Sequence, residues 1–396
     1  MSALSFHDAR RLVLEKLRHV RSAAIEYVDL DGASSRVLGA EVRADRDYPP
    51  VDRSVRDGFA VRAGELPGEF EVTGEVRAGE TSHLSLGTGQ AIEIMTGAAV
   101  PPGADAIVMV EHTTRNGSKM RTGRMPKPGE FINRAGSEAR SGEIVLARGD
   151  LLTFSRIAML AAVGMTRVPV FRKPSVAILS TGDEVVAVES NPETNQVRNS
   201  NAWAVAAQVR RSGGEPLILP VARDLYKETR RLIEQGLESD LLLLSGGVSA
   251  GKYDLVEQVL ADLGAEFFFT RVLIQPGQPL VFGRAQDTFF FGLPGNPAST
   301  MVTFEVFGRA AVEALAGQPQ PALPLTYARL TREFRHKTGL TRFLPALLAR
   351  DGLEVTPVAW QGSSDVPALA RANAFLVAEA GRESWPAGDF IPVLPQ

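Results

Sequence analysis

The chain of 396 residues contains no cysteine. Disulfides, thiolate ligands to a metal, iron–sulfur clusters and a cysteine nucleophile are therefore excluded. Histidine is scarce as well: the five histidines are His7, His19, His83, His112 and His336. None of them stands at metal-ligand spacing from another, which argues against a zinc or haem enzyme.

Long apolar runs and an excess of one charge are also missing. No stretch approaches the roughly 20 apolar residues that cross a bilayer, and the N-terminal segment MSALSFHDARRLVLEKLRHVR lacks the apolar core of a signal peptide. Lysine and arginine number 43 against 46 aspartates and glutamates, and no basic stripe alternates with aromatic residues. We therefore expect neither a membrane nor nucleic acid as a partner, and a cytoplasmic location.

The length exceeds what one hydrophobic core usually supports, and the texture of the sequence changes along it. Recurring glycines and short alternating runs predict a β-rich inserted domain over residues 45–135. Helical patterns precede and follow it, at residues 4–20 and 154–163. From this order we expect the two helices to pack together, so that residues 1–44 and 136–172 form one discontinuous connecting domain of helices and strands.

Residues 173–318 repeat a strand–loop–helix pattern, which predicts a mostly parallel α/β domain. A proline-rich linker follows at residues 317–325, and the short alternating strands of residues 319–396 predict a small β-barrel or sandwich. The expected fold class is therefore multidomain, with a central α/β domain, a β-rich insertion and a C-terminal β domain.

Four loops follow the expected parallel strands, and they read STGDE (180–184), ARD (222–224), SGGVSAGKYD (245–254) and GLPGNP (292–297). Ligands of open parallel sheets bind beyond the carboxyl ends of the strands. Glycine lets a backbone approach a ligand, and free amides at a helix start attract phosphate. The loops therefore predict a site for a phosphorylated or nucleotide-bearing ligand.

Four acidic residues in these loops would converge on one rim: Asp183, Glu184, Asp224 and Asp254. Clustered carboxylates facing bound phosphates are the setting that magnesium prefers. The alternative, that Asp224 and Asp254 only cap the helices that follow them, stays open. Magnesium is accordingly the expected metal.

Residues 246–252 match two well-known motifs at once. They read G-x-x-x-x-G-K, as in the phosphate loop of nucleoside triphosphatases, but Tyr253 stands where that motif needs a hydroxyl for magnesium. They also contain G-x-S-x-G around Ser249, and a serine hydrolase would then depend on His336, the one histidine downstream. Both alternatives are disfavoured.

Five segments carry a resemblance that runs over nearly the whole chain. Residues 54–62 read SVRDGFAVR, similar to M-D-G-[YF]-A-[VL]-R, and residues 94–108 read IMTGAAVPPGADAIV, similar to I-x-T-G-A-x-x-P-x-G-A-D-A-V-V. STGDE, SGGVS with Asp254, and GLPGNP follow in order. On these motifs the chain resembles the molybdopterin molybdenumtransferase family, which includes MoeA and the homologous half of gephyrin.

The resemblance implies an elongated homodimer with four domains per chain. The α/β domain of one subunit would face the β insertion of the other and form the active site between them. The implied reaction brings molybdate to adenylylated molybdopterin with magnesium and releases AMP. Molybdopterin adenylyltransferase and apo-molybdoenzymes are the implied partners. A receptor scaffold like gephyrin is a minor alternative, because we expect no fused upstream domain or long disordered linker.

Carried over position by position, the resemblance assigns site residues in three groups. The catalytic group is Asp57, Thr96, Glu184, Asp224 and Asp254, of which Glu184, Asp224 and Asp254 would also hold the metal. Arg342 and Ser363 correspond to positions that hold molybdate. The cofactor-binding group comprises Ser180, Thr181, Gly182, Asp183, Ser245, Gly246, Gly247, Ser249, Lys252, Gln275, Gln278, Pro294, Gly295, Asn296 and Pro297.

The chain departs from the family pattern where K-P-G-K-P or K-P-G-x-P is common, since it has glutamine at both Gln275 and Gln278. A neutral hydrogen bond contributes about 0.5–1.5 kcal/mol, against roughly 1.5–3 kcal/mol for one to a charged group. Lys252 is the expected substitute cation. Asn199 replaces the usual aspartate, and residues 136–138 read GSE in place of GED. We expect the charges of the site to be rebalanced and the site to be active. The alternatives are a preference for tungstate and a non-catalytic paralogue that binds the pterin nucleotide.

Overall fold

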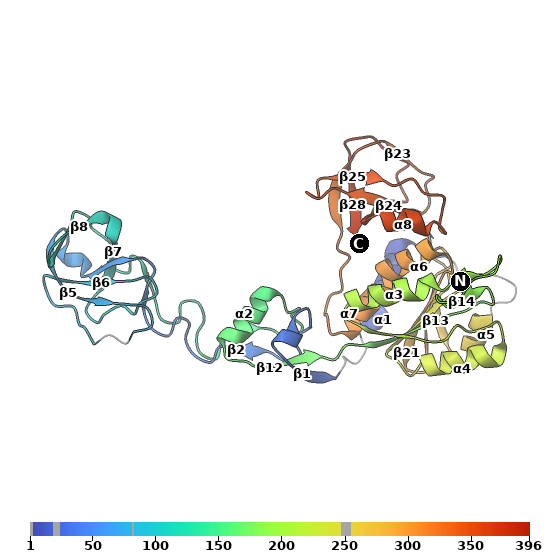
Figure 1. Ribbon diagram of the computed structural model, residues 1–396, viewed down its shortest axis with the longest axis horizontal. Coiled ribbons are helices and arrows are strands. Elements are labelled where there is room, and N and C mark those ends of the chain that lie inside the picture. The colour runs from blue at the N-terminus through green and yellow to red at the C-terminus, as the bar shows by residue number, and fades with distance from the viewer. Residues whose placement is uncertain (1–2, 19–23, 81–82, 247–254) are drawn as a thin grey trace.

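The computed structural model describes residues 3–18, 24–80, 83–246 and 255–396. The chain is elongated, with the β-rich insertion at one end, a small connecting region in the middle, and the α/β domain with the C-terminal domain at the other end (Figure 1). No helix within the described ranges is long and apolar enough to cross a membrane.

The α/β domain is built on a six-stranded sheet in the order β16-β13-β17-β21-β20-β18. The first four strands are parallel, as the repeated strand–loop–helix pattern predicts, and near one edge β20 runs antiparallel to both of its neighbours, β21 and β18. The bounds are β13 (Ser175–Ser180), β16 (Glu215–Ile218), β17 (Leu241–Ser245), β18 (Glu266–Phe269), β20 (Val281–Ala285) and β21 (Thr288–Leu293).

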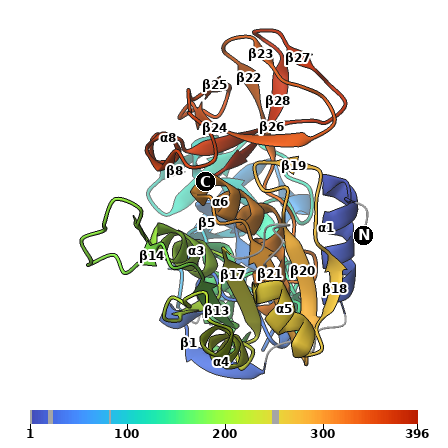
Figure 2. The same cartoon turned by 90° about the vertical axis from the view of Figure 1, so that its right-hand side faces the viewer.

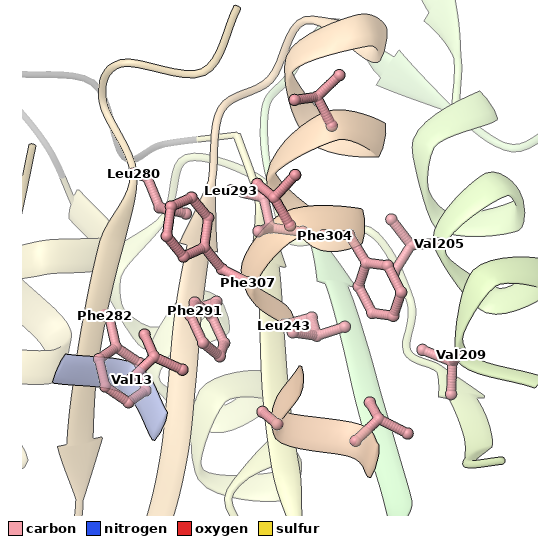
Figure 3. Packing of buried hydrophobic residues seen from close by; sticks show 14 of the residues in the cluster. Val13, Val205, Val209, Leu243, Leu280, Phe282, Phe291, Leu293, Phe304 and Phe307 are labelled. Carbon is pink, nitrogen blue, oxygen red and sulfur yellow. The ribbon is translucent and has the colours of Figure 1, made fainter. Parts of the chain in front are cut away.

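Helices cover both faces of this sheet. Val205 of α3 faces Phe304, Phe307 lies beside Leu280, and Leu243 and Phe291 belong to the same core (Figure 3). A second apolar cluster lies between the opposite face and α4 and α5. The helices are α3 (Ser200–Arg211), α4 (Tyr226–Gly236), α5 (Leu255–Asp262) and a continuous run of α6 (Pro297–Thr303), η4 (Phe304–Gly308) and α7 (Arg309–Leu315).

The N-terminal helix α1 (Phe6–Leu17) lies against the α/β domain, beside the β18–β20 edge (Figure 2). Its apolar stripe is buried in the core of that domain, and the ring of Phe6 lies 5.8 Å from that of Phe307. The expected packing of this helix against the helix at 154–163 is therefore wrong. Hydrophobic spacing gave the buried face of α1 but not its partner, since periodicity does not identify the surface that covers a helix.

The connecting region has its own small core between two strand pairs and α2 (Phe154–Ala162). Strand β1 (Ile25–Asp29) pairs antiparallel with β12 (Arg167–Phe171), and β2 (Val42–Arg43) with β11 (Ile144–Leu146). The segments that enter and leave the insertion therefore lie side by side here.

The insertion holds a second six-stranded sheet, in the order β7-β4-β6-β5-β9-β8. Two apolar clusters lie on its two faces. A short pair, β3 (Arg53–Ser54) with β10 (Ile132–Asn133), stands where the chain enters and leaves. The sheet strands are β4 (Gly58–Val61), β5 (Gly68–Val76), β6 (Gln90–Ile94), β7 (Ala106–Met109), β8 (Thr113–Asn116) and β9 (Lys119–Thr122).

The C-terminal domain is a closed small barrel, because β24 pairs with both β25 and β26 in the order β24-β25-β22-β28-β26. Strand β19 (Ile274–Gln275) of the α/β domain joins it beside β24, with Gln275 opposite Arg342. The barrel strands are β22 (Thr326–Leu330), β24 (Thr341–Leu348), β25 (Glu354–Pro357), β26 (Ala374–Ala378) and β28 (Phe390–Pro395), with helix α8 (Val366–Arg371).

Candidate active site

Three parallel strands of the α/β domain end at the same level. Ser180 at the end of β13 stands opposite Ser245 at the end of β17, and Ser245 stands opposite Leu293 at the end of β21. The loops that follow therefore meet, and they line a cleft of about 690 Å³ together with the start of α3. The predicted residues on its walls are Ser180, Thr181, Glu184, Ser245, Gly246, Pro294, Gly295, Asn296 and Pro297.

Gly246 lets the first two loops approach each other closely. Its φ of +93° lies in the left-handed region, and a Cβ built there would stand 2.7 Å from the carbonyl oxygen of Thr181. The Thr181 amide donates to Ser245 O at 3.0 Å, and the Gly182 amide to Ala222 O at 3.1 Å. The loop backbones are therefore tied together beside the cleft, and the predicted residue Gly182 is not among those that line it.

Two asparagines fix the floor of the cleft. Asn199 caps α3: its Oδ1 accepts from Ser180 Oγ at 2.9 Å and from the Ala202 amide at 3.2 Å. Asn201 Nδ2 donates to Ser245 Oγ at 3.0 Å and to Gly295 O at 2.7 Å, so one side chain joins the ends of β17 and β21. The motif reading missed Asn201, for which the available signal was the run Asn-Ser-Asn at the helix start.

Two of the predicted carboxylates, Asp183 and Glu184, act on a third, Asp224. Burial raises the pKa of Asp224 above its ordinary value, and the negative charges of Asp183 and Glu184 raise it further. The Asp224 amide also donates to Asp183 Oδ1 at 3.2 Å. Helix α4 takes Leu225 as its N-cap without a side-chain bond, so Asp224 does not cap it. The described residues contain no group of three potential ligands close enough to hold a metal ion.

The residues predicted for the anion stand on the side of the cleft that faces the barrel. Gln275 lies opposite Arg342 across the β19–β24 pair, and Asn296 Nδ2 donates to Ser363 Oγ at 3.0 Å. Pro279 lines the cleft, whereas Gln278 does not. The structure thus brings Gln275 to Arg342 and Asn296 to Ser363, but not the four into one group with Glu184.

Asp57 and Thr96 lie in the β insertion and form a unit of their own. The Thr96 amide and hydroxyl donate to one oxygen of Asp57, at 2.6 Å and 2.8 Å, and these two hydrogen bonds lower the pKa of Asp57. Within one chain this pair and the Glu184 cleft occupy opposite ends of the molecule (Figure 1). The expected catalytic group is therefore divided between two distant parts of the chain.

Four predicted residues, Gly247, Ser249, Lys252 and Asp254, lie outside the described residues. The two motifs read in residues 246–252 lie there almost entirely. His336, which a serine hydrolase would require, stacks on Trp385 at 5.3 Å in the barrel domain, and neither of its ring nitrogens has a hydrogen-bond partner. No described acid orients it, so nothing in the described chain supports a triad.

Three family models match the chain in sequence. They are the MoeA N-terminal region (domain I and II) at residues 4–164, a probable molybdopterin binding domain at residues 177–315, and the MoeA C-terminal region (domain IV) at residues 327–396. The molybdopterin molybdenumtransferase of Bacillus subtilis (strain 168) is 37% identical over 383 residues, which cover 93% of this chain and 89% of the relative.

The chain belongs to the molybdopterin molybdenumtransferase family. The Haemophilus influenzae member is 32% identical over 400 residues, covering 99% of this chain and 98% of its own. The crystal structure of the molybdopterin biosynthesis moeA protein from Pyrococcus horikoshii OT3 is similar over the full length of both chains, with a TM-score of 0.84 and 27% identity. The resemblance that the motifs predict is confirmed, and the chain is an enzyme of molybdenum cofactor biosynthesis.

Proposed function

We propose that this chain inserts molybdate into adenylylated molybdopterin, with release of AMP and the molybdenum cofactor. The observation that carries the proposal is the 37% identity, over 93% of the chain, to a molybdopterin molybdenumtransferase. The cleft supports it, because glycine-containing loops and a helix start surround a space that suits a phosphorylated ligand.

The active site in this proposal is shared between two copies of the chain. Asp57 and Thr96 present an exposed, ionised carboxylate at one end of the molecule, and the Glu184 cleft stands at the other. A second chain running the opposite way would bring the two halves together twice, as an isologous dimer requires. The proposal therefore makes the homodimer the working unit.

Magnesium would be held by Glu184 and Asp224, with Asp254 as a further ligand. The fit rests on chemistry of the described acids: the charges of Asp183 and Glu184 raise the pKa of Asp224, and a divalent cation relieves that repulsion. Carboxylate oxygens are the ligands that magnesium prefers. When bound, the ion would neutralise charge on the phosphate oxygens as the pyrophosphate link is hydrolysed.

In this proposal the protein side chains bind and orient the substrates. Asp57, kept ionised by Thr96, acts from the partner's insertion, Pro294 and Pro297 stiffen one wall, and Arg342 with Ser363 receives molybdate beside Gln275. The cytosolic location and the two protein partners stay predictions. The preference of the site for molybdate over tungstate also stays a prediction, because two oxyanions of the same shape and charge make the same hydrogen bonds.

The test is AMP release from adenylylated molybdopterin with magnesium, with and without molybdate, coupled to activation of an apo-molybdoenzyme. We expect molybdate-dependent release that Glu184→Ala lowers by at least about a hundredfold, since a charged group in the site is lost. Glu238→Gln, an exposed acid outside the cleft, is the matched control. Tight binding of the ligand without release would contradict the proposal and favour a non-catalytic paralogue, and release with tungstate alone would identify the anion.

A further inference from the structure

Arg198 is the one cation among the described residues that line the cleft. It lies in β15 (Val197–Arg198), which pairs with β14 (Val185–Val186) at the rim. Its Nε donates to Ser190 O at 3.0 Å, which anchors the guanidinium from one side. In the described chain no carboxylate pairs with it, so its terminal nitrogens are available to an anion.

The floor of the cleft carries neutral polar groups rather than a cation. Because Gly295 O accepts hydrogen bonds and cannot donate them, the atom of Asn201 that faces it at 2.7 Å is the amide nitrogen. The Asn201 oxygen is then turned away from both partners of Nδ2, and it is buried without any hydrogen-bond partner. The hydroxyl of Thr181, a residue only 4% exposed, is likewise buried and unpaired.

An unpaired, buried acceptor excludes an anion and favours a donor. Phosphate and molybdate oxygens carry negative charge at neutral pH and offer no hydrogen to the Asn201 oxygen, and the carboxylate of Glu184 lines the same cleft. Leaving such an acceptor unpaired costs about 1–3 kcal/mol. Because these atoms are already out of contact with water, only the ligand N–H or O–H loses water when the hydrogen bond forms.

We propose that the cleft binds its ligand in one orientation. A phosphate of the ligand contacts Arg198, and a neutral ring that carries an N–H group contacts Asn201 and Thr181. Arg198 thus serves as the anion-binding cation in a chain where Gln275 and Gln278 stand in place of the family's lysines. The identity of the ligand rests on the proposed function. Two rings of adenylylated molybdopterin carry such donors, the pterin and the adenine, and the shared chemistry is an N–H group within a planar heterocycle.

The test is calorimetric binding of three probes to the intact protein: inorganic pyrophosphate, AMP and molybdopterin. Arg198→Ala should weaken pyrophosphate by about tenfold or more, the loss of one charge-assisted hydrogen bond. Thr181→Val and Asn201→Ala should leave pyrophosphate unchanged and weaken one ring-bearing probe by about fivefold to tenfold. The probe that responds, AMP or molybdopterin, identifies the ring on the floor.

Controls separate this proposal from a loss of fold and from the proposed reaction. Arg210→Ala removes an exposed arginine from the far end of α3 and should change no affinity, and Thr181→Ser should restore binding that Thr181→Val loses. Unchanged pyrophosphate affinity in Arg198→Ala, or an equal loss of all three probes in Asn201→Ala and Thr181→Val, would overturn the inference. Because binding is measured without turnover, failure of AMP release in the wild type would contradict the proposed function alone.

Discussion

Two aspartates of the proposed site have pKa values shifted in opposite directions, and the cause in each case is local. Asp57 accepts two hydrogen bonds from Thr96, which favour its charged form. Its folded-state pKa is lowered, so any stability that it contributes is present above its unfolded-state pKa and is lost as the pH falls. Asp224 is partly buried beside Asp183 and Glu184, which disfavour its charged form and raise its pKa.

Asp183→Asn offers a test of that electrostatic coupling. The amide keeps an oxygen that can accept from the Asp224 backbone, but it removes one of the two charges that raise the pKa of Asp224. We expect the acid limb of the pH profile of AMP release to move to lower pH. The midpoint of the limb is the quantity to compare, since magnesium affinity will change the amplitude. With Glu238→Gln the midpoint should stay in place, and an unchanged midpoint in Asp183→Asn would show that the Asp183 charge does not govern the pKa of Asp224.

Motifs made most of the cleft predictable at the level of residues. Ser180, Thr181, Glu184 and the last four residues of GLPGNP, 294–297, were expected from their positions after strands, and they do line one cleft. Asn201 and Arg198 were not expected, because their importance depends on contacts with β17, β21 and β14 that are distant in sequence. The run Asn-Ser-Asn marks the start of α3, but it does not show which strand ends the Asn201 side chain joins.

At the level of elements, the end of β17 depends on one glycine. An alanine at Gly246 would have a strained φ and a Cβ 2.7 Å from a backbone oxygen of the neighbouring loop, which must move. We expect Gly246→Ala to lower the free energy of unfolding by roughly 2–4 kcal/mol and to weaken AMP binding, because the Thr181 loop shifts. Denaturant unfolding and calorimetry measure the two effects.

Gly264 provides the matched control for that change. Its φ is +77°, but a Cβ there would meet nothing within 4 Å. Gly264→Ala should therefore lose only about 1–2 kcal/mol from backbone strain and leave AMP affinity unchanged. Equal losses of stability in the two variants, with equal affinities, would mean that the close approach of the two loops has no part in the site.

The elements that sequence predicted best are those buried on both faces. Strands β13 and β17 are continuous apolar runs, and a run of this kind is easily recognised in a sequence. The strand–loop–helix repeat did not predict the antiparallel strand β20, nor that β18 and β19, close together in the chain, join different sheets. The packing of α1 was wrong for a related reason: periodicity identifies the buried face of an element but not the surface that buries it.

At the scale of the whole molecule, the order of the domains was predictable from the sequence. The distance between the insertion, with Asp57, and the α/β domain, with Glu184, was not. The insertion is defined by a change of texture in the sequence, and its distance from the α/β domain results from the strand pairs β1–β12 and β2–β11 between them. Those pairs are too short and too ordinary to be recognised by pattern. Under the proposed function, this separation leaves each chain with two halves of a site that only a second chain completes.

Mixing two inactive variants tests whether these halves belong to different chains. In a heterodimer of Asp57→Ala with Glu184→Ala, one of the two shared sites carries both changes and the other carries neither. If subunits exchange at random, half of the dimers are heterodimers with one intact site, and AMP release should recover to about one quarter of the wild-type rate. The measurement is AMP release before and after mild denaturation and joint refolding of the two purified variants.

The control for this mixture is a pair of variants that alter the same half. Glu184→Ala mixed with Asp224→Ala should recover nothing, because in a heterodimer each site takes its cleft from one chain and therefore carries one of the two changes. Recovery in that control would show repair by another route, and no recovery with Asp57→Ala would place both halves of the working site in a single chain. Because the insertion and the α/β domain stand at opposite ends of one chain, we expect recovery in the mixture of Asp57→Ala with Glu184→Ala and none in the control.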